Sequence, residues 1–345
     1  MANGDDNDIF VFLGGEQEVN MADGDDDDIF VYLGGEQEVP DEITHAIIDP
    51  SVNIVRTGAF VDRQHLVSVI FHAGVEVVEY EAFCGCYSLS GRIKLLGVRE
   101  IRQRAFHRCL TLSSVEFGGR LETIGMEAFC GCHLLRSIKL PSVRNVQDWA
   151  FVNCDDLNDV EFGINLETIG IGSFNNCPSL QRIVIPLKIG LFSPDPIEQR
   201  YTQFDDCHNL ATVDLVGAEG KHNTISSLLL ESWKDEMNQE IDRINQELPN
   251  IPSREKTDFI RLWIRSVING MEHYKAEHRR LLKEHMTLLE LAVWKAKLDE
   301  RDDDSTQRVQ TKRARIDEVS SREDKRITSG ADTIIKNVLP FLKLL

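Results

Sequence analysis

The chain has 345 residues, is 42% apolar and 28% charged, and has a formal net charge of −19. This length allows two domains, and an acidic balance excludes the basic surface that nonspecific binding to nucleic acid requires. The negative charge is concentrated at the start, because residues 1–57 contain 15 acidic residues and one arginine.

The chain begins with an acidic segment in place of a positively charged leader. It also contains no run of about 18 apolar residues that would suit a membrane span. We therefore expect a cytoplasmic protein without nucleic-acid or membrane partners. The short basic motif Lys312–Arg315 resembles a minimal nuclear import signal, so a nuclear location is an alternative.

The first 40 residues are a tandem duplication. Residues 1–20 and 21–40 are identical at 16 of 20 positions. Only the second copy can adjoin the rest of the fold, so residues 1–28 are predicted to be an acidic and largely disordered extension. Its alternatives are a docking tail or a redundant copy. Ile29–Leu33 is predicted to be a short strand, within an N-terminal cap and degenerate first repeat over 29–57.

A phenylalanine recurs seven times in the following part of the chain, at spacings of 23, 23, 23, 22, 23 and 30 residues. A leucine lies six positions after each one, and apolar residues nine and eleven positions after it indicate a short strand with one buried face. A fixed period in the twenties is typical of a solenoid of strand-and-turn units. The recurring residues are Phe60, Phe83, Phe106, Phe129, Phe151, Phe174 and Phe204.

The repeat resembles the BspA-type leucine-rich repeat. The resemblance rests on the segment from Glu127 to Pro141, EAFCGCHLLRSIKLP, and on the later LETIG from Leu166. It implies an α/β fold over 58–222, with a parallel sheet on one face, a role in protein binding, and no catalytic residue or cofactor. Arg63 departs from the pattern where cysteine is expected. The acidic start and helical end further resemble predicted intracellular repeat proteins of unicellular algae.

Six of the eight cysteines lie three positions after a phenylalanine and are predicted to form a buried ladder of free thiols. Parallel Cβ vectors on neighbouring repeats do not suit disulfides. The pairs Cys84/Cys86 and Cys130/Cys132 lie two repeats apart, about 10 Å, which is too far for a shared zinc ion. The ladder residues are Cys86, Cys109, Cys132, Cys154, Cys177 and Cys207.

An insertion over 191–201 lengthens the sixth spacing and is interpreted as a surface loop with two exposed aromatic residues, Phe192 and Tyr201. From Thr224 the apolar period becomes helical, and a break at Pro249–Pro252 predicts an antiparallel helical hairpin over 223–299. Its second helix has a heptad pattern that includes His278 and His285, interpreted as polar seam residues. Residues 300–345 are predicted to be a charged linker and C-terminal helices.

Two functions are considered. The first is a non-enzymatic scaffold that binds a partner protein through charged residues on the outer sheet face. The second is self-association through the long heptad helix, giving a homo-oligomer. Neither a phosphate-binding loop nor a hydrolase motif occurs, so an enzyme is the least favoured class. The predicted face residues are Arg92, Lys94, Glu116, Lys139, Asp159, Glu161, Arg182 and Asp214.

Overall fold

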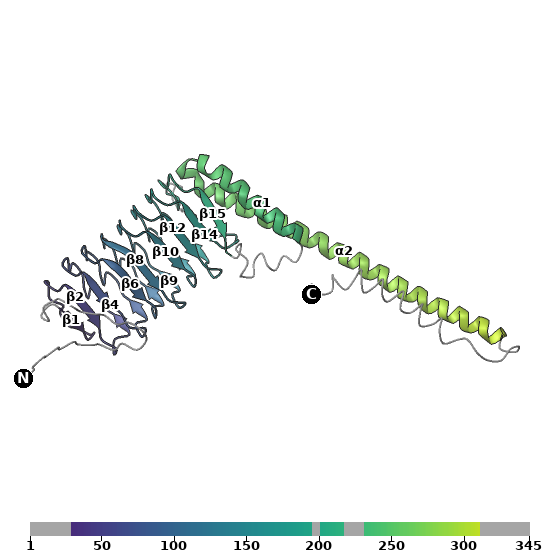
Figure 1. Ribbon diagram of the computed structural model, residues 1–345, viewed down its shortest axis with the longest axis horizontal. Helices are drawn as coiled ribbons and strands as arrows, with labels where there is room; N and C mark the ends of the chain where they lie inside the picture. The colour runs from purple at the N-terminus through teal and green to yellow at the C-terminus, as the bar shows by residue number, and fades with distance from the viewer. Residues whose placement is uncertain (1–28, 195–200, 217–230, 311–345) are drawn as a thin grey trace, which may run out of the picture. The chain divides into compact units, whose positions relative to one another are not determined.

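A computed structural model describes residues 29–194, 201–216 and 231–310 (Figure 1). The chain divides into two compact units, Met1–Val267 and Ile268–Leu345. The first unit contains all the strands, the helix α1 (Glu231–Glu247) and the beginning of the helix α2 (Ser253–Gln310).

The first unit is a solenoid of parallel strands, as the repeat predicts. Each repeat forms one rung, and successive rungs pair side by side in three sheets. The first sheet contains β1 (Ile29–Tyr32), β2 (His45–Ile48) and β4 (Ser68–Ile70). The long-strand sheet contains β6 (Gly91–Leu95), β8 (Leu112–Phe117), β10 (Ser137–Leu140), β12 (Asp159–Phe162), β14 (Arg182–Ile185) and β15 (Thr212–Leu215). The short-strand sheet contains β3 (Ile54–Val55), β5 (Val77–Val78), β7 (Glu100–Ile101), β9 (Thr123–Ile124), β11 (Asn145–Val146) and β13 (Thr168–Ile169).

In the second repeat the apolar pair, Ile93 and Leu95, lies one position later than in the other repeats, and this produces a register shift at one rung boundary. Gly91 pairs with Leu112 but Arg92 pairs with Ser114, so Ser113 is the extra residue. Ile93 then lies opposite Val115. Because of this extra residue, the buried side chains of β6 and β8 are aligned again after the shift, and the following repeats keep the same spacing.

The seven phenylalanines form a continuous buried stack. Their exposed fractions are at most 1%, and neighbouring ring centroids lie between 4.8 Å and 5.8 Å apart with nearly parallel planes. The backbone repeats with the rings: the amide of Phe129 donates to the Ala150 carbonyl oxygen at 2.8 Å, and the rungs from Phe60 to Phe174 have equivalent bonds. At the last rung the Phe204 amide donates instead to Oγ1 of Thr257. Each ring therefore packs mainly against the rungs directly before and after it.

The cysteine ladder has a hydrogen-bond function that the spacing did not predict. Each ladder thiol donates to the carbonyl oxygen of the phenylalanine one repeat earlier, at distances from 2.9 Å to 3.3 Å. All eight cysteines are free, as predicted. Burial raises the pKa of the Cys86 thiol to about 12, so the ladder is held in the protonated, donating form.

Arg63 replaces cysteine at the rung where the phenylalanine stack begins. Its guanidinium donates to the carbonyl oxygens of Val39 and Val61 and forms an ion pair with Asp41 at 3.1 Å. Tyr32 is buried beside Phe60, with ring centroids 5.2 Å apart. The departure from the repeat pattern therefore belongs to the junction with the N-terminal cap.

The helices close the last rung of the solenoid. The α1 helix packs on β15, and the Val213 amide donates to Oδ1 of Asn245 at 2.8 Å. A short 3-10 turn, Leu248–Asn250, connects α1 to α2. Lys256 of α2 is only 1% exposed, and its Nζ donates to the carbonyl oxygens of His208 at 3.1 Å and Leu210 at 2.6 Å.

The predicted end of the second helix is wrong. The α2 helix runs to Gln310 through residues interpreted as the start of a charged linker. Residues 300–310 contain neither glycine nor proline, and charged side chains alone do not end a helix. The remainder of the linker, Lys312–Arg315, the C-terminal segment 331–345, the acidic extension 1–28 and the first turns predicted from Thr224 lie outside the described residues.

The part of α2 that belongs to the second unit carries exposed apolar residues. Met286, Leu288 and Leu291 have exposed fractions of 43%, 63% and 57%. His285 is also exposed. Within the described part of the chain, no helix is long and apolar enough to span a membrane.

Candidate functional site

The eight predicted face residues all lie on the long-strand sheet and point away from the core. Alternation along each strand separates them from buried neighbours such as Ile93 and Leu95 of β6. Arg92, Glu116 and Lys139 are exposed, and the other five are partly buried. The parallel register brings charges of opposite sign side by side on adjacent strands.

Seven of the eight residues form ion pairs with one another. Arg182 lies between two carboxylates, at 3.0 Å from Asp159 and 2.6 Å from Asp214. Lys139 lies 3.0 Å from Glu161, and this hydrogen bond raises the pKa of Lys139. Arg92 lies 3.8 Å from Glu116. The pairs join β6 to β8, β10 to β12, β12 to β14, and β14 to β15, so they follow most of the sheet.

Lys94 is the face charge that stays outside these pairs. It pairs in register with Glu116, but the carboxylate of Glu116 lies within 4.0 Å of Arg92 instead. Among the described residues, no carboxylate forms an ion pair with Lys94. Its ammonium group is thus a donor on this face that a ligand can use without displacing an internal partner.

Ion pairing between rungs also occurs away from this face. Beside the short-strand sheet, Arg144 lies 3.0 Å from Glu167 and Arg99 lies 3.2 Å from Glu122. Exposed pairs of this kind contribute about 0.2–1 kcal/mol each. Charge pairing is therefore found on both the long-strand and the short-strand sides of the solenoid, and its most exposed pairs are weak enough for an incoming charge to replace them.

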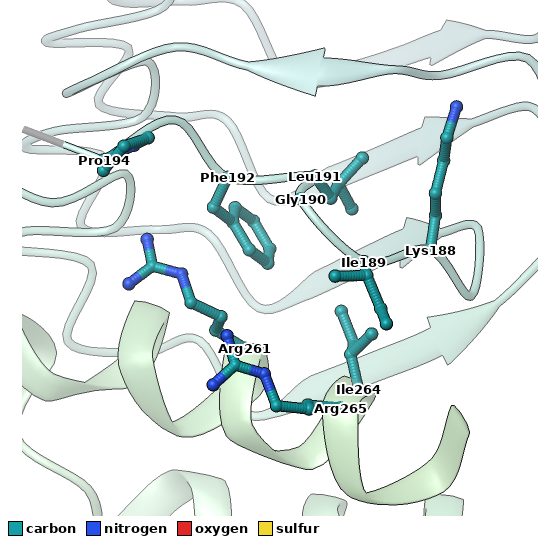
Figure 2. A pocket seen from close by; sticks show the side chains of 9 residues that line it. All are labelled: Lys188, Ile189, Gly190, Leu191, Phe192, Pro194, Arg261, Ile264 and Arg265. Carbon is teal, nitrogen blue, oxygen red and sulfur yellow. The ribbon is translucent and has the colours of Figure 1, made fainter. Parts of the chain in front are cut away.

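An apolar pocket that the sequence patterns did not predict lies at the last rungs (Figure 2). Its volume is about 270 Å³. Ile189 and Phe192 face Ile264 and Arg261 of α2 across it, and three cations lie at its wall. The pocket forms between the inserted loop and a helix that begins about 60 residues later, a contact that no periodic signal indicates. Its lining is Lys188, Ile189, Gly190, Leu191, Phe192, Pro194, Arg261, Ile264 and Arg265.

The insertion differs from the prediction at Phe192. This aromatic residue is only 4% exposed, whereas Tyr201 is 43% exposed as expected. Phe192 forms a parallel bridge with Ile169 and packs edge-on against Phe204 at 5.8 Å. The first part of the insertion therefore extends the short-strand sheet by one rung before the chain leaves the repeat, which explains why Phe192 is buried.

The described residues give no support to a metal site. No group of three or more His, Cys, Asp and Glu side chains among them has suitable geometry. Burial raises the pKa of Cys84, and that of Cys130 to about 11. These two thiols are the members of the Cys-x-Cys pairs that lie outside the ladder, and both are partly buried.

The BspA-type leucine-rich repeat model matches six copies over residues 40–95 and 99–216. The chain belongs to this family. Proteins with BspA-type repeats generally use the fold as a non-enzymatic scaffold for protein interaction. The matched residues extend over the rungs from β2 to β15, and they include every predicted face residue.

Solved structures of leucine-rich repeat proteins are similar to this BspA-type chain. A T. pallidum leucine-rich repeat protein is 31% identical, with a TM-score of 0.40 over 45% of this chain and 72% of that one. A leucine-rich repeat protein from Bacteroides ovatus is 23% identical, with a TM-score of 0.35; the match covers 50% of this chain and 55% of that one, so this chain spans about half of that protein. No curated protein matches the sequence.

Proposed function

We propose that the protein is a scaffold that binds a partner protein through the outer face of the long-strand sheet. The observation that carries the proposal is the set of charges along β6 to β15. It includes Lys94, which forms no ion pair within the described ranges, and ion pairs that a ligand can exchange. Mixed charges of this kind favour selective recognition of a folded surface with complementary charges.

Charge reversal at Lys139 is expected to weaken partner binding by about tenfold, which corresponds to about 1.4 kcal/mol. Lys139→Glu places two carboxylates together on the proposed face. The matched control is Arg144→Glu, because Arg144 and Lys139 both lie 3.0 Å from a glutamate but only Lys139 is on the long-strand sheet. The partner is first identified by affinity purification and mass spectrometry of the intact protein, and calorimetry then compares the variants.

The comparison of Lys139→Glu with Arg144→Glu tests whether the long-strand sheet is the binding face. Loss of affinity in Lys139→Glu alone supports the long-strand sheet as the binding face. Equal losses in both variants, or unchanged affinity in Lys139→Glu, contradict it.

The second candidate function is self-association through α2. The exposed Leu288 and Leu291 of the second unit favour it, because large apolar side chains on a helix stabilise contact with another helix. We expect the double variant Leu288→Glu and Leu291→Glu to have about half the molar mass of the intact protein by light scattering, as for a dimer converted to monomers. A monomeric intact protein would exclude this function.

A further inference from the structure

The two ends of the solenoid are closed differently. At the C-terminal end, α1 packs on β15, and the side-chain oxygen of Asn245 accepts a hydrogen bond from the Val213 amide. At the N-terminal end, β1 pairs with β2 on one side only, within the part of the chain that the structure describes. The outer edge of β1 is therefore a strand edge with which no other described strand pairs.

On the outer edge of β1, the backbone groups bond to the side chain of Gln37. The inner edge faces β2, and there the Tyr32 carbonyl oxygen accepts from the Asp49 amide at 3.0 Å. Val31 and Leu33 face the other side. There, Nε2 of Gln37 donates to the Val31 carbonyl oxygen at 3.2 Å, and the Leu33 amide donates to Oε1 of Gln37 at 2.7 Å. An amide side chain thus makes two of the bonds that another strand would make.

The exposure of the edge is consistent with a missing strand. Val31 and Leu33 are 44% and 62% exposed, although both belong to an apolar run. An exposed edge of this composition tends to pair with a further extended segment. The chain itself contains a segment that matches β1.

Residues 9–19, IFVFLGGEQEV, repeat residues 29–39, IFVYLGGEQEV, with one difference. The repeated stretch includes every element of the β1 edge: the strand, the glutamine that bonds to it, and the glycine pair. In the second copy this pair, Gly34 and Gly35, turns the chain with φ of +79° and +69°, which glycine adopts readily. The first copy can therefore form the same strand and turn.

The spacing of the copies suits one more rung. Ile9 precedes Ile29 by 20 residues, while β1 begins 16 residues before β2 and β2 begins 23 residues before β4. A turn of 20 residues thus falls between two turns that the solenoid already makes. We propose that Ile9–Phe12 of the same chain adds in parallel to the outer edge of β1 and takes the place of the Gln37 side chain.

Charge gives this pairing an unusual salt dependence. The pairing proposed here would bring Asp5, Asp6 and Asp8 beside Asp25, Asp26 and Asp28, at the separation of about 4.8 Å typical of neighbouring strands. Like charges opposite one another oppose strand pairing, and salt screens them. Pairing is therefore strengthened by salt, whereas docking of the acidic segment on a basic surface such as the pocket cations would be weakened by it.

Hydrogen exchange of the full-length protein tests the proposal. The Phe10→Pro variant removes a backbone donor on the side that faces β1, since Phe10 corresponds to Phe30, and it blocks pairing at the centre of the added strand; Ala2→Pro, outside the strand, is the control. In about 0.5 M salt, we expect amides of residues 29–33 to exchange at least about tenfold more slowly in the intact protein and in Ala2→Pro than in Phe10→Pro. The difference should shrink at low salt.

Two further measurements keep the outcome decisive. Gln37→Ala removes the competing side chain, so protection should persist or increase; loss of protection in this variant would show that Gln37 alone covers the edge and would overturn the proposal. Equal exchange in Phe10→Pro and the intact protein would also overturn it. Protection that rises with protein concentration, together with a doubled mass by light scattering, would assign the edge to a second copy of the chain instead.

Discussion

Replacing Phe129 with alanine is expected to lower the free energy of unfolding of the solenoid by about 3–5 kcal/mol. The Phe129 ring is fully buried, with centroids of Phe106 and Phe151 at 5.3 Å and 5.4 Å and an edge contact to Phe117 at 6.2 Å. Truncation leaves a cavity between two rungs that the parallel ladders hold at a fixed separation, so the site cannot collapse around alanine.

The damage should be local at first, because stability in a solenoid is a sum of terms between neighbours. Denaturant unfolding gives the total loss, and hydrogen exchange should show faster opening on both sides of Phe129 than at β1. Tyr80→Ala is the control, since Tyr80 is 37% exposed. A loss below about 1 kcal/mol, typical of surface substitutions, would contradict a structural role for the ring stack.

The variant Lys256→Met is expected to destabilise the C-terminal end by about 3 kcal/mol, because it leaves two buried carbonyl oxygens without a donor. These are the His208 and Leu210 oxygens, which accept from Nζ at 3.1 Å and 2.6 Å. Methionine restores the apolar volume but supplies no proton. Burial of Lys256 itself has a cost, and it lowers the pKa of the ammonium group. The substitution removes that cost but not the desolvation of the two acceptors.

The measurement is denaturant unfolding combined with alkylation of Cys207, the thiol of the last rung. Cys207 should react faster in Lys256→Met than in the intact protein, while Cys109 should be unaffected. Lys283→Met, at an exposed position of α2, is the matched control. A Lys256→Met protein as stable as the intact one would mean that desolvation of the ammonium group outweighs its two hydrogen bonds.

The solenoid was predictable because its signals are periodic. One phenylalanine and one leucine per repeat define the rung, and the alternation around Ile93 and Leu95 identifies the outer face residues. The same periodicity also predicts the ion pairs. Asp159 and Arg182 are one period apart, and so are Arg144 and Glu167. Opposite charges at that separation lie on adjacent strands.

The contacts at the C-terminal end were not predictable in this way. Phe192 belongs to an insertion whose sequence is typical of a surface loop, so its bridge with Ile169 and its burial went unrecognised. Lys256 contacts the carbonyl oxygens of residues 46 and 48 positions earlier, across the change from repeat to helix. A lysine on a helix is ordinarily solvated, and only the three-dimensional packing shows that this one closes the last rung.

The thiol ladder also makes the protein its own reporter of local opening. Each rung from the second to the last has one buried cysteine, and its thiol becomes available only when the bond to the preceding phenylalanine carbonyl breaks. Alkylation followed by mass spectrometry would thus give a separate opening rate at six known heights along the solenoid. Fraying from either end, and the arrest of fraying by a bound partner, would be visible rung by rung without any introduced label.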